Sequence, residues 1–305
     1  MRPPMWHKLY TPLHWDTHAP HWPDHAHSRF VQTRSYRWHV QVMGQGPVML
    51  MLHGTGASAH TWAGMRAVLQ THYTLVCPDL PGHGFTTTLA QDDYSLPSMT
   101  SALCELLAHM ACTPQVVVVH SAGAAVGMSL VMHRAPADTM ALVGLNPAWL
   151  PLPGMAQWLF PVAAKLAALN PLSGWLTSKQ ASPHRVQQLL QSTGSNLNAQ
   201  QRAPYDVLLQ SAHHVQGVLR MMSQWDVHPL VPRFVQHVQQ HPCRVLIQAG
   251  SADRTIPMHH AQQVQHALPH CSLQVLDGLG HLAHEENASL SAQQLLAWLS
   301  LQTDR

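Results

Sequence analysis

The stretch Val119-His-Ser-Ala-Gly123 decides the fold, because it places a serine between a strand-like segment and a helix-like segment. The apolar run Val116-Val117-Val118 before it is typical of a buried strand, and the alanine-rich residues 124–130 after it are typical of a helix. A serine on a sharp strand-to-helix turn presents its hydroxyl at the end of a sheet, so Ser121 is predicted to be a nucleophile. The alternative is that Ser121 is an ordinary helix N-cap, for which serine is also favoured.

Such a turn needs small residues on both sides of the nucleophile, because the backbones of strand and helix nearly touch there. Gly123 meets this need and Val119 does not, so the turn has one glycine fewer than the usual Gly-x-Ser-x-Gly pattern. Val119 is therefore the one residue expected to strain the turn or displace Ser121. If it does, replacing Val119 by glycine would speed the reaction of Ser121 with a serine-directed probe.

A carboxylate and a histidine follow in the chain order Ser, Asp, His. Asp253 comes after the apolar run 244–250, and His281 comes after the alternating run 272–276 and a glycine-rich turn. Both residues therefore lie on loops that follow strands, where a parallel sheet gathers its functional groups. This order is found in the α/β-hydrolase fold and in neither chymotrypsin nor subtilisin. We predict that Asp253 orients His281 and that His281 is the base for Ser121.

Position alone singles out His281, because the chain contains 26 histidines and most of them are expected at the surface. His284 is the alternative base. The neighbouring Glu285 and Glu286 instead favour a place for His284 on the first turn of a final helix over residues 284–301, where acidic side chains complement the helix N-terminus.

An oxyanion hole is predicted from a second strand-and-turn motif. The apolar run Val48–Leu52 is typical of a buried strand and ends in His53-Gly54-Thr55-Gly56. The backbone N–H of Thr55, together with the N–H of Ala122 after the nucleophile, would form the oxyanion hole. The alternative is an ordinary glycine turn. The oxyanion reading is favoured because the glycine-containing turn 79–84 and the Ser121 turn follow in the order expected of such a hydrolase.

A resemblance to a known family covers nearly the whole chain and is carried by residues 52–58, 78–85, 120–125 and 278–286, with shorter matches at 28–31, 37–40, 168–172 and 221–226. These stretches resemble the magnesium-chelatase accessory proteins of bacteriochlorophyll biosynthesis, a group of α/β-hydrolase-fold proteins from photosynthetic bacteria. It implies a role around magnesium insertion into a porphyrin, a tetrapyrrole as ligand and magnesium-chelatase subunits as partners. In that group the turn carries glycine where this chain has Val119.

The composition describes a globular chain of 305 residues, with 46% hydrophobic and 10% charged residues and a formal net charge of +2. No nucleic-acid partner is expected from such a balance. The five cysteines are odd in number and lack Cys-x-x-Cys spacing, so neither a disulfide framework nor a metal site is indicated. No apolar secretory segment is evident. A cytoplasmic protein without a metal or cofactor is therefore expected.

The chain is predicted to fold as a mostly parallel sheet flanked by helices, with a helical cap inserted into it. We expect a hairpin over 28–43, strands over 74–77, 116–119 and 141–145, and helices over 61–69 and 99–110. Strand signals vanish between residues 149 and 231, so residues 1–148 and 232–305 are assigned to the core and residues 149–231 to the cap.

The cap is rich in apolar and aromatic residues and is expected to roof a pocket for a hydrophobic small molecule. The residues assigned to this pocket are His53, Gly54, His120, Trp149, Trp158, Phe160 and Trp225. The alternative is that the aromatic residues only pack the cap onto the core. Residues 149–169 are about long enough to span a membrane, but Pro151, Pro153, Pro161 and Lys165 argue against a span and favour a lid. Association of this lid with a membrane surface stays open.

Two functions follow from the sequence. The leading one is a serine hydrolase that acts on an ester-like or other carbonyl substrate through Ser121, His281 and Asp253. The alternative is an accessory protein that binds a porphyrin or a chelatase subunit without catalysis.

Overall fold

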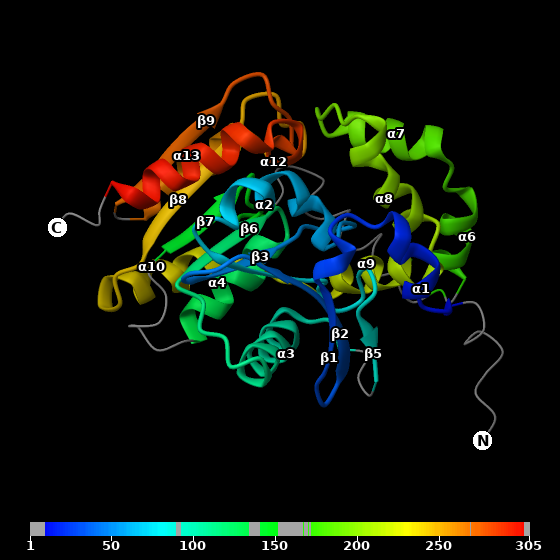
Figure 1. Ribbon diagram of the computed structural model, residues 1–305. Helices are drawn as coiled ribbons and strands as arrows, with labels where there is room; N and C mark the ends of the chain where they lie inside the picture. Colours follow the sequence, from blue (N-terminus) through cyan, green and yellow to red (C-terminus); the bar gives the residue numbers. More distant parts are fainter. Residues whose placement is uncertain are drawn as a thin grey trace.

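A mostly parallel sheet flanked by helices forms the centre of the molecule, as predicted (Figure 1). The computed structural model describes residues 10–89, 93–133, 141–151, 167, 170, 172–268 and 270–301. Its strands are β1 (Ser28–Gln32), β2 (Tyr36–Met43), β3 (Val48–Leu52), β4 (Thr74–Pro78), β5 (Thr87–Thr88), β6 (Val116–His120), β7 (Ala141–Leu145), β8 (Arg244–Gly250) and β9 (Cys271–Leu276).

The strand order in the sheet is β1-β2-β4-β3-β6-β7-β8-β9, with the short β5 paired to β2. The hairpin predicted over 28–43 is confirmed, because β1 and β2 pair antiparallel with Phe30 opposite His39. From β4 to β9 all neighbouring strands are parallel. The carboxyl ends of β3, β6, β8 and β9 therefore meet at one edge of the sheet, which is where the predicted functional residues follow.

Helices cover both faces of the sheet (Figure 1). The α-helices are α1 (Trp15–His18), α2 (Ala63–Leu69), α3 (Leu96–His109), α4 (Gly123–His133), α6 (Ser173–Gln180), α7 (Pro183–Ser192), α8 (Ala199–Leu209), α9 (Ala212–Gln224), α10 (Leu230–Gln240), α11 (Met258–Ala267), α12 (Ala283–Glu286) and α13 (Ala288–Ser300). Short 3-10 turns are η2 (Ala19–His21), η3 (His25–His27) and η4 (Ala59–Trp62).

Alternation along the central strands divides the core into two layers. In β3, Leu50 and Leu52 pack on the side of α3, α4, α10 and α11, whereas Met49 and Met51 pack on the side of α2 and α13. Successive side chains of a strand point to opposite faces, so a central strand that is covered on both faces is apolar throughout. This is why the continuous apolar runs of the sequence could be assigned to buried strands.

The segment between β7 and β8 contains helices α6 to α10 and no strand among its described residues. Figure 1 shows α6 to α9 together at one side of the sheet. Helix α9 touches the core closely, because a methyl group added to Gly217 would overlap the backbone of Gly82. The cap boundaries 149–231 stay a prediction. No helix in the described ranges has the length and apolar character that a bilayer span requires.

The end of the chain differs from the single helix predicted over 284–301. The structure has two helices there, α12 and α13, which meet at Asn287. The backbone of Asn287 is non-helical, and its side chain accepts a hydrogen bond of 3.2 Å from the Leu290 N–H. Asparagine is a favoured N-cap, so it ends the short α12 and begins α13. His284 therefore lies on α12.

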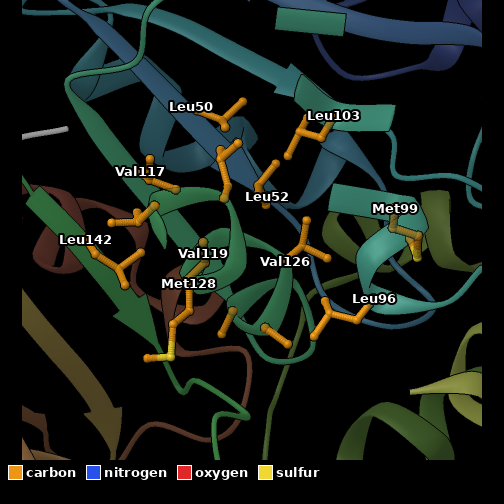
Figure 2. Close-up of a cluster of buried hydrophobic side chains, with 14 of the residues drawn as sticks. Leu50, Leu52, Leu96, Met99, Leu103, Val117, Val119, Val126, Met128 and Leu142 are labelled. Atoms are coloured by element: carbon orange, nitrogen blue, oxygen red, sulfur yellow. The ribbon is translucent and has the colours of Figure 1, made fainter. Parts of the chain in front are cut away.

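The absence of a glycine at position 119 is compensated by a glycine on the facing helix. Val119 is fully buried in the core cluster of Figure 2. A methyl group added to Gly127 of α4 would overlap the γ1 methyl of Val119, but it would lie 3.6 Å from the Val119 β carbon. The close approach of strand β6 and helix α4 at this contact therefore depends on the glycine of the helix.

We therefore expect Gly127→Ala to destabilise the wild-type protein by about 1–3 kcal/mol, because it overpacks the contact with Val119. In a Val119→Ala background the same change should cost little, since the overlapping methyl is gone and alanine is a better helix former by ~1 kcal/mol. Urea unfolding of the four proteins measures both effects. An equal cost in the two backgrounds would contradict this account of the contact.

Candidate active site

Ser121 lies on a sharp turn between β6 and α4, as predicted. Its φ of 48° is in the left-handed region, which is uncommon for a residue with a side chain. A methyl group on Gly123 would overlap the carbonyl oxygen of His53, and one on Gly54 would lie 2.8 Å from the β carbon of Ser121. Glycine is therefore required at both positions, and the backbone of the β3 loop reaches the serine side chain.

The three predicted side chains form a continuous hydrogen-bonded chain. The Oγ of Ser121 lies 2.9 Å from Nε2 of His281, and Nδ1 of His281 lies 2.9 Å from Oδ2 of Asp253. Because a carboxylate only accepts, Nδ1 carries the proton and Nε2 is left to accept the hydrogen bond from the serine. The side chains of His281 and Asp253 are only 8% and 1% exposed, so bulk water does not compete for these bonds.

Asp253 is fixed by further donors that the sequence did not identify. Its Oδ1 accepts from the N–H groups of Thr255 and Ile256 at 2.7 and 3.0 Å, and its Oδ2 also accepts from Nδ2 of Asn146 at 2.6 Å. Together with His281 these donors occupy the four acceptor positions of the carboxylate. Asn146 directly follows β7, so its place at a strand end was the available signal.

His120 contacts both the backbone and the ring of His281. Its Nε2 donates to the backbone carbonyl of His281 over 3.0 Å, and its ring centroid lies 4.8 Å from that of His281. Burial, with His284 and His281 nearby, holds the pKa of His120 well below its usual range. His120 is therefore a neutral group that packs against His281.

The predicted oxyanion loop lies beside Ser121. Among the bonds between described residues, the N–H groups of Thr55 and Ala122 have no acceptor. His53 holds the start of this loop, because its Nδ1 donates to the Gly54 carbonyl at 2.8 Å and its Nε2 accepts from Leu80 N–H at 2.9 Å. His53 is fully buried, and its two nitrogens join the loop after β3 to the turn after β4.

Helix α9 contacts the same loop. Nε2 of His214 donates to the carbonyl of Gly56 over 3.2 Å, and its Nδ1 accepts from the N–H of Gly84 at 3.1 Å. Burial lowers the pKa of His214 to about 3, so the ring is neutral and can both donate and accept. Asp79, in the turn of Gly84, accepts from Ala59 N–H at 2.7 Å. These bonds connect the turns after β3 and β4.

His284, the alternative base, has its contacts elsewhere. Its Nε2 lies 2.8 Å from Oγ1 of Thr61, and burial lowers its pKa to about 3. The neighbouring Glu285 accepts from the hydroxyls of Thr61 and Tyr205, each at 2.5 Å. Of the two histidines, His281 is the one in hydrogen-bond contact with Ser121.

The two described tryptophans assigned to a pocket differ in how deeply they are buried. Trp149 is fully buried in the core, and its indole N–H donates to the carbonyl of Ala124 at 2.8 Å. Trp225 is partly buried and donates to the carbonyl of Tyr94 at 2.7 Å. Trp158 and Phe160 lie outside the described residues. In the described ranges no group of three or more His, Cys, Asp or Glu side chains is arranged to hold a metal ion.

Glu285 gives the protein a pH-dependent stability that can be measured. Burial raises its pKa to about 7, above the ordinary value of 4.5. As pH rises from about 4.5 to about 7, the unfolded chain loses this proton and the folded chain keeps it, so the free energy of unfolding falls. We expect the free energy of unfolding of Glu285→Gln, relative to that of wild type, to rise by a few kcal/mol across that interval and to stay constant above it. Denaturant titrations at several pH values test this, and a difference independent of pH would contradict it.

Comparison with known proteins identifies the family. A model of the "Alpha/beta hydrolase family" matches residues 49–293. The "Magnesium-chelatase 30 kDa subunit" of Rhodobacter capsulatus is 36% identical over 284 residues, which cover 91% of this chain and 96% of that protein.

Solved structures of two esterases show the same fold at low identity. The thermophilic esterase of Thermogutta terrifontis is 16% identical with a TM-score of 0.70, covering 89% of this chain and 97% of its own. The esterase of Exiguobacterium antarcticum is 16% identical with a TM-score of 0.71, covering 88% and 98%. The chain therefore belongs to the alpha/beta hydrolase family, and within it to the group of the magnesium-chelatase 30 kDa subunit.

Proposed function

We propose that the protein is a serine hydrolase that cleaves an ester-like or other carbonyl substrate. The observation that carries the proposal is the unbroken chain of hydrogen bonds from Ser121 through His281 to Asp253. Nucleophile, base and orienting carboxylate are in mutual contact, which is the arrangement that activates a serine hydroxyl.

In the proposed reaction, Oγ of Ser121 attacks the substrate carbonyl while its proton passes to Nε2 of His281. The tetrahedral intermediate collapses when His281 returns that proton to the leaving group, and an acyl group remains on Ser121. Water, deprotonated by His281, then attacks the acyl carbonyl, and His281 returns the proton to Oγ of Ser121 as the acid is released. Asp253 stabilises the imidazolium formed in each half of the reaction and keeps the ring aimed at the serine.

The negative oxygen of the intermediate would be bound by the N–H groups of Thr55 and Ala122. Two features support this assignment: neither N–H has an acceptor among the described residues, and Gly54 brings the Thr55 loop against Ser121. Fixed donors aimed at the developing charge are the largest single contribution in many such enzymes. The reaction needs no cofactor.

The substrate is proposed to be a hydrophobic small molecule that enters beneath the helical cap. The name of the Rhodobacter capsulatus relative further supports a role close to a magnesium chelatase, with a tetrapyrrole as the substrate class and chelatase subunits as partners. We further propose that the protein is located in the cytoplasm, where it can associate with a membrane surface.

A second function is favoured by the name of the Rhodobacter capsulatus relative, which describes a subunit of a magnesium chelatase and not a hydrolase. In this alternative the protein holds a porphyrin or contacts the chelatase while the triad is idle. The two functions differ in whether Ser121 reacts.

We expect a fluorophosphonate probe to label Ser121 in the wild-type protein. His281→Ala should slow labelling by ~10²–10⁴-fold, because the serine loses its general base. His266→Ala is the matched control, since His266 is exposed and bonds within its own helix. Mass spectrometry of the labelled peptide gives both site and rate. Undiminished labelling of His281→Ala would show that another base serves Ser121.

Catalysis and accessory binding are separated by Ser121→Ala in a photosynthetic host that lacks the protein. If hydrolysis is the function, the variant should fold and accumulate like wild type yet fail to restore pigment synthesis, because no neighbouring group replaces the nucleophile. Pigment absorbance and protein level are the two measurements. Full restoration by Ser121→Ala would leave the accessory function.

A further inference from the structure

The turn between α7 and α8, residues 193–195, is in direct contact with both loops that carry the catalytic pair. The backbone carbonyl of Thr193 accepts from Arg254 N–H at 3.1 Å and from His281 N–H at 3.4 Å. Arg254 follows Asp253 in the chain, so one carbonyl oxygen bridges the loop of the acid and the loop of the base. The hydroxyl of Ser195 in turn accepts from Leu282 N–H at 2.8 Å.

Close backbone packing accompanies these bonds. A methyl group on Gly194 would overlap the carbonyl oxygen of Ala252, and one on Gly280 would overlap the backbone of Gly194. Gly194 has a φ of 88°, which favours glycine. The 193–195 turn is therefore inserted between the two loops with no room for side chains at the contact.

The loops that carry Asp253 and His281 need this support, because the backbone hydrogen bonds between them end before either residue is reached. The last backbone bond between them runs from the Ala252 N–H to the Leu279 carbonyl at 2.9 Å. Ala252 directly precedes Asp253, and Leu279 lies two residues before His281. Beyond that point the described residues join the loops through the Asp253–His281 pair and through the Thr193 carbonyl. Without the turn, the His281 loop would keep the bond from His120 to the His281 carbonyl and the bond from the Gly280 N–H to Glu286, but it would lose the backbone bridge to the loop of Asp253.

We infer that the 193–195 turn positions the triad, with Ser195 as a positioning residue that fixes the His281 loop through Leu282. This inference rests on the proposed serine-hydrolase function. The helical segment between β7 and β8 is then a structural part of the catalytic machinery, in addition to covering the substrate. Ser195 is only 2% exposed, so removal of its hydroxyl leaves the Leu282 N–H buried without an acceptor.

The test compares Ser195→Ala with Ser192→Ala in hydrolysis of p-nitrophenyl butyrate. Ser192 lies three residues away on α7, is exposed, and bonds only to the Leu189 carbonyl of its own helix among the described contacts. We expect Ser195→Ala to lower kcat by roughly tenfold with little change in KM, because the base is misaligned while the substrate site is untouched. Ser192→Ala should match wild type, and Ser195→Thr, which keeps the hydroxyl, should recover most of the loss.

A double-mutant cycle distinguishes positioning from general stability. If Ser195 acts through the His281–Asp253 pair, its effect should nearly vanish in an Asp253→Asn background, where that pair is already disrupted. A full tenfold loss in that background, or no loss in the wild-type background, would overturn the inference. Should Ser195→Ala fail to fold, Ser195→Cys keeps the size with a weaker acceptor and should give a smaller loss in the same direction.

A wild-type protein that neither hydrolyses the ester nor reacts with a fluorophosphonate would refute the proposed function. The positioning of the loops by the 193–195 turn is then tested by a measurement that does not depend on activity. Amide hydrogen exchange of residues 251–256 and 278–284 should be faster in Ser195→Ala than in Ser192→Ala. Equal exchange in the two variants would overturn the positioning of the loops.

Discussion

The close approach of two backbone turns around Ser121 is the constraint on which the rest of the site depends. Gly123 at the start of α4 packs against the carbonyl of His53, and Gly54 packs against the side chain of Ser121. Contacts of this kind fix Ser121 and the loop of Thr55 relative to each other, since neither can move toward the other without a steric clash. The left-handed conformation of Ser121 is maintained by this packing, as strained residues at functional sites generally are.

Buried histidines give the surroundings of the site their electrostatic character. Burial lowers the pKa of His53, His120, His214 and His284, so each is a neutral group. Neutral imidazoles donate and accept one hydrogen bond each, which suits them to connect the loops. Because these four rings carry no charge, a positive charge formed on His281 beside Asp253 meets no imidazolium among them.

Local patterns in the sequence were sufficient for the strands and for placing Ser121, Asp253 and His281 on the turns that follow them. Apolar runs mark buried strands, and Ser121, Asp253 and His281 each lie within a few residues of the end of a strand. The residues that support them could not be predicted in the same way, because their contacts join distant parts of the chain. Gly127 compensates for Val119 across a helix–strand contact, Asn146 reaches Asp253, and the 193–195 turn inserts between two loops that lie much later in the sequence. The helix break at Asn287 did have a local signal, since asparagine is a common N-cap.

The central claim is that a turn with valine in place of glycine still presents a reactive serine to a formed oxyanion hole. A crystal structure of the protein after reaction with a fluorophosphonate tests it most directly. The account predicts phosphorus bonded to Oγ of Ser121, with one phosphonyl oxygen within hydrogen-bond distance of both the Thr55 and Ala122 N–H groups. An unmodified Ser121 after prolonged exposure to the reagent, or a phosphonyl oxygen directed away from those two groups, would contradict it.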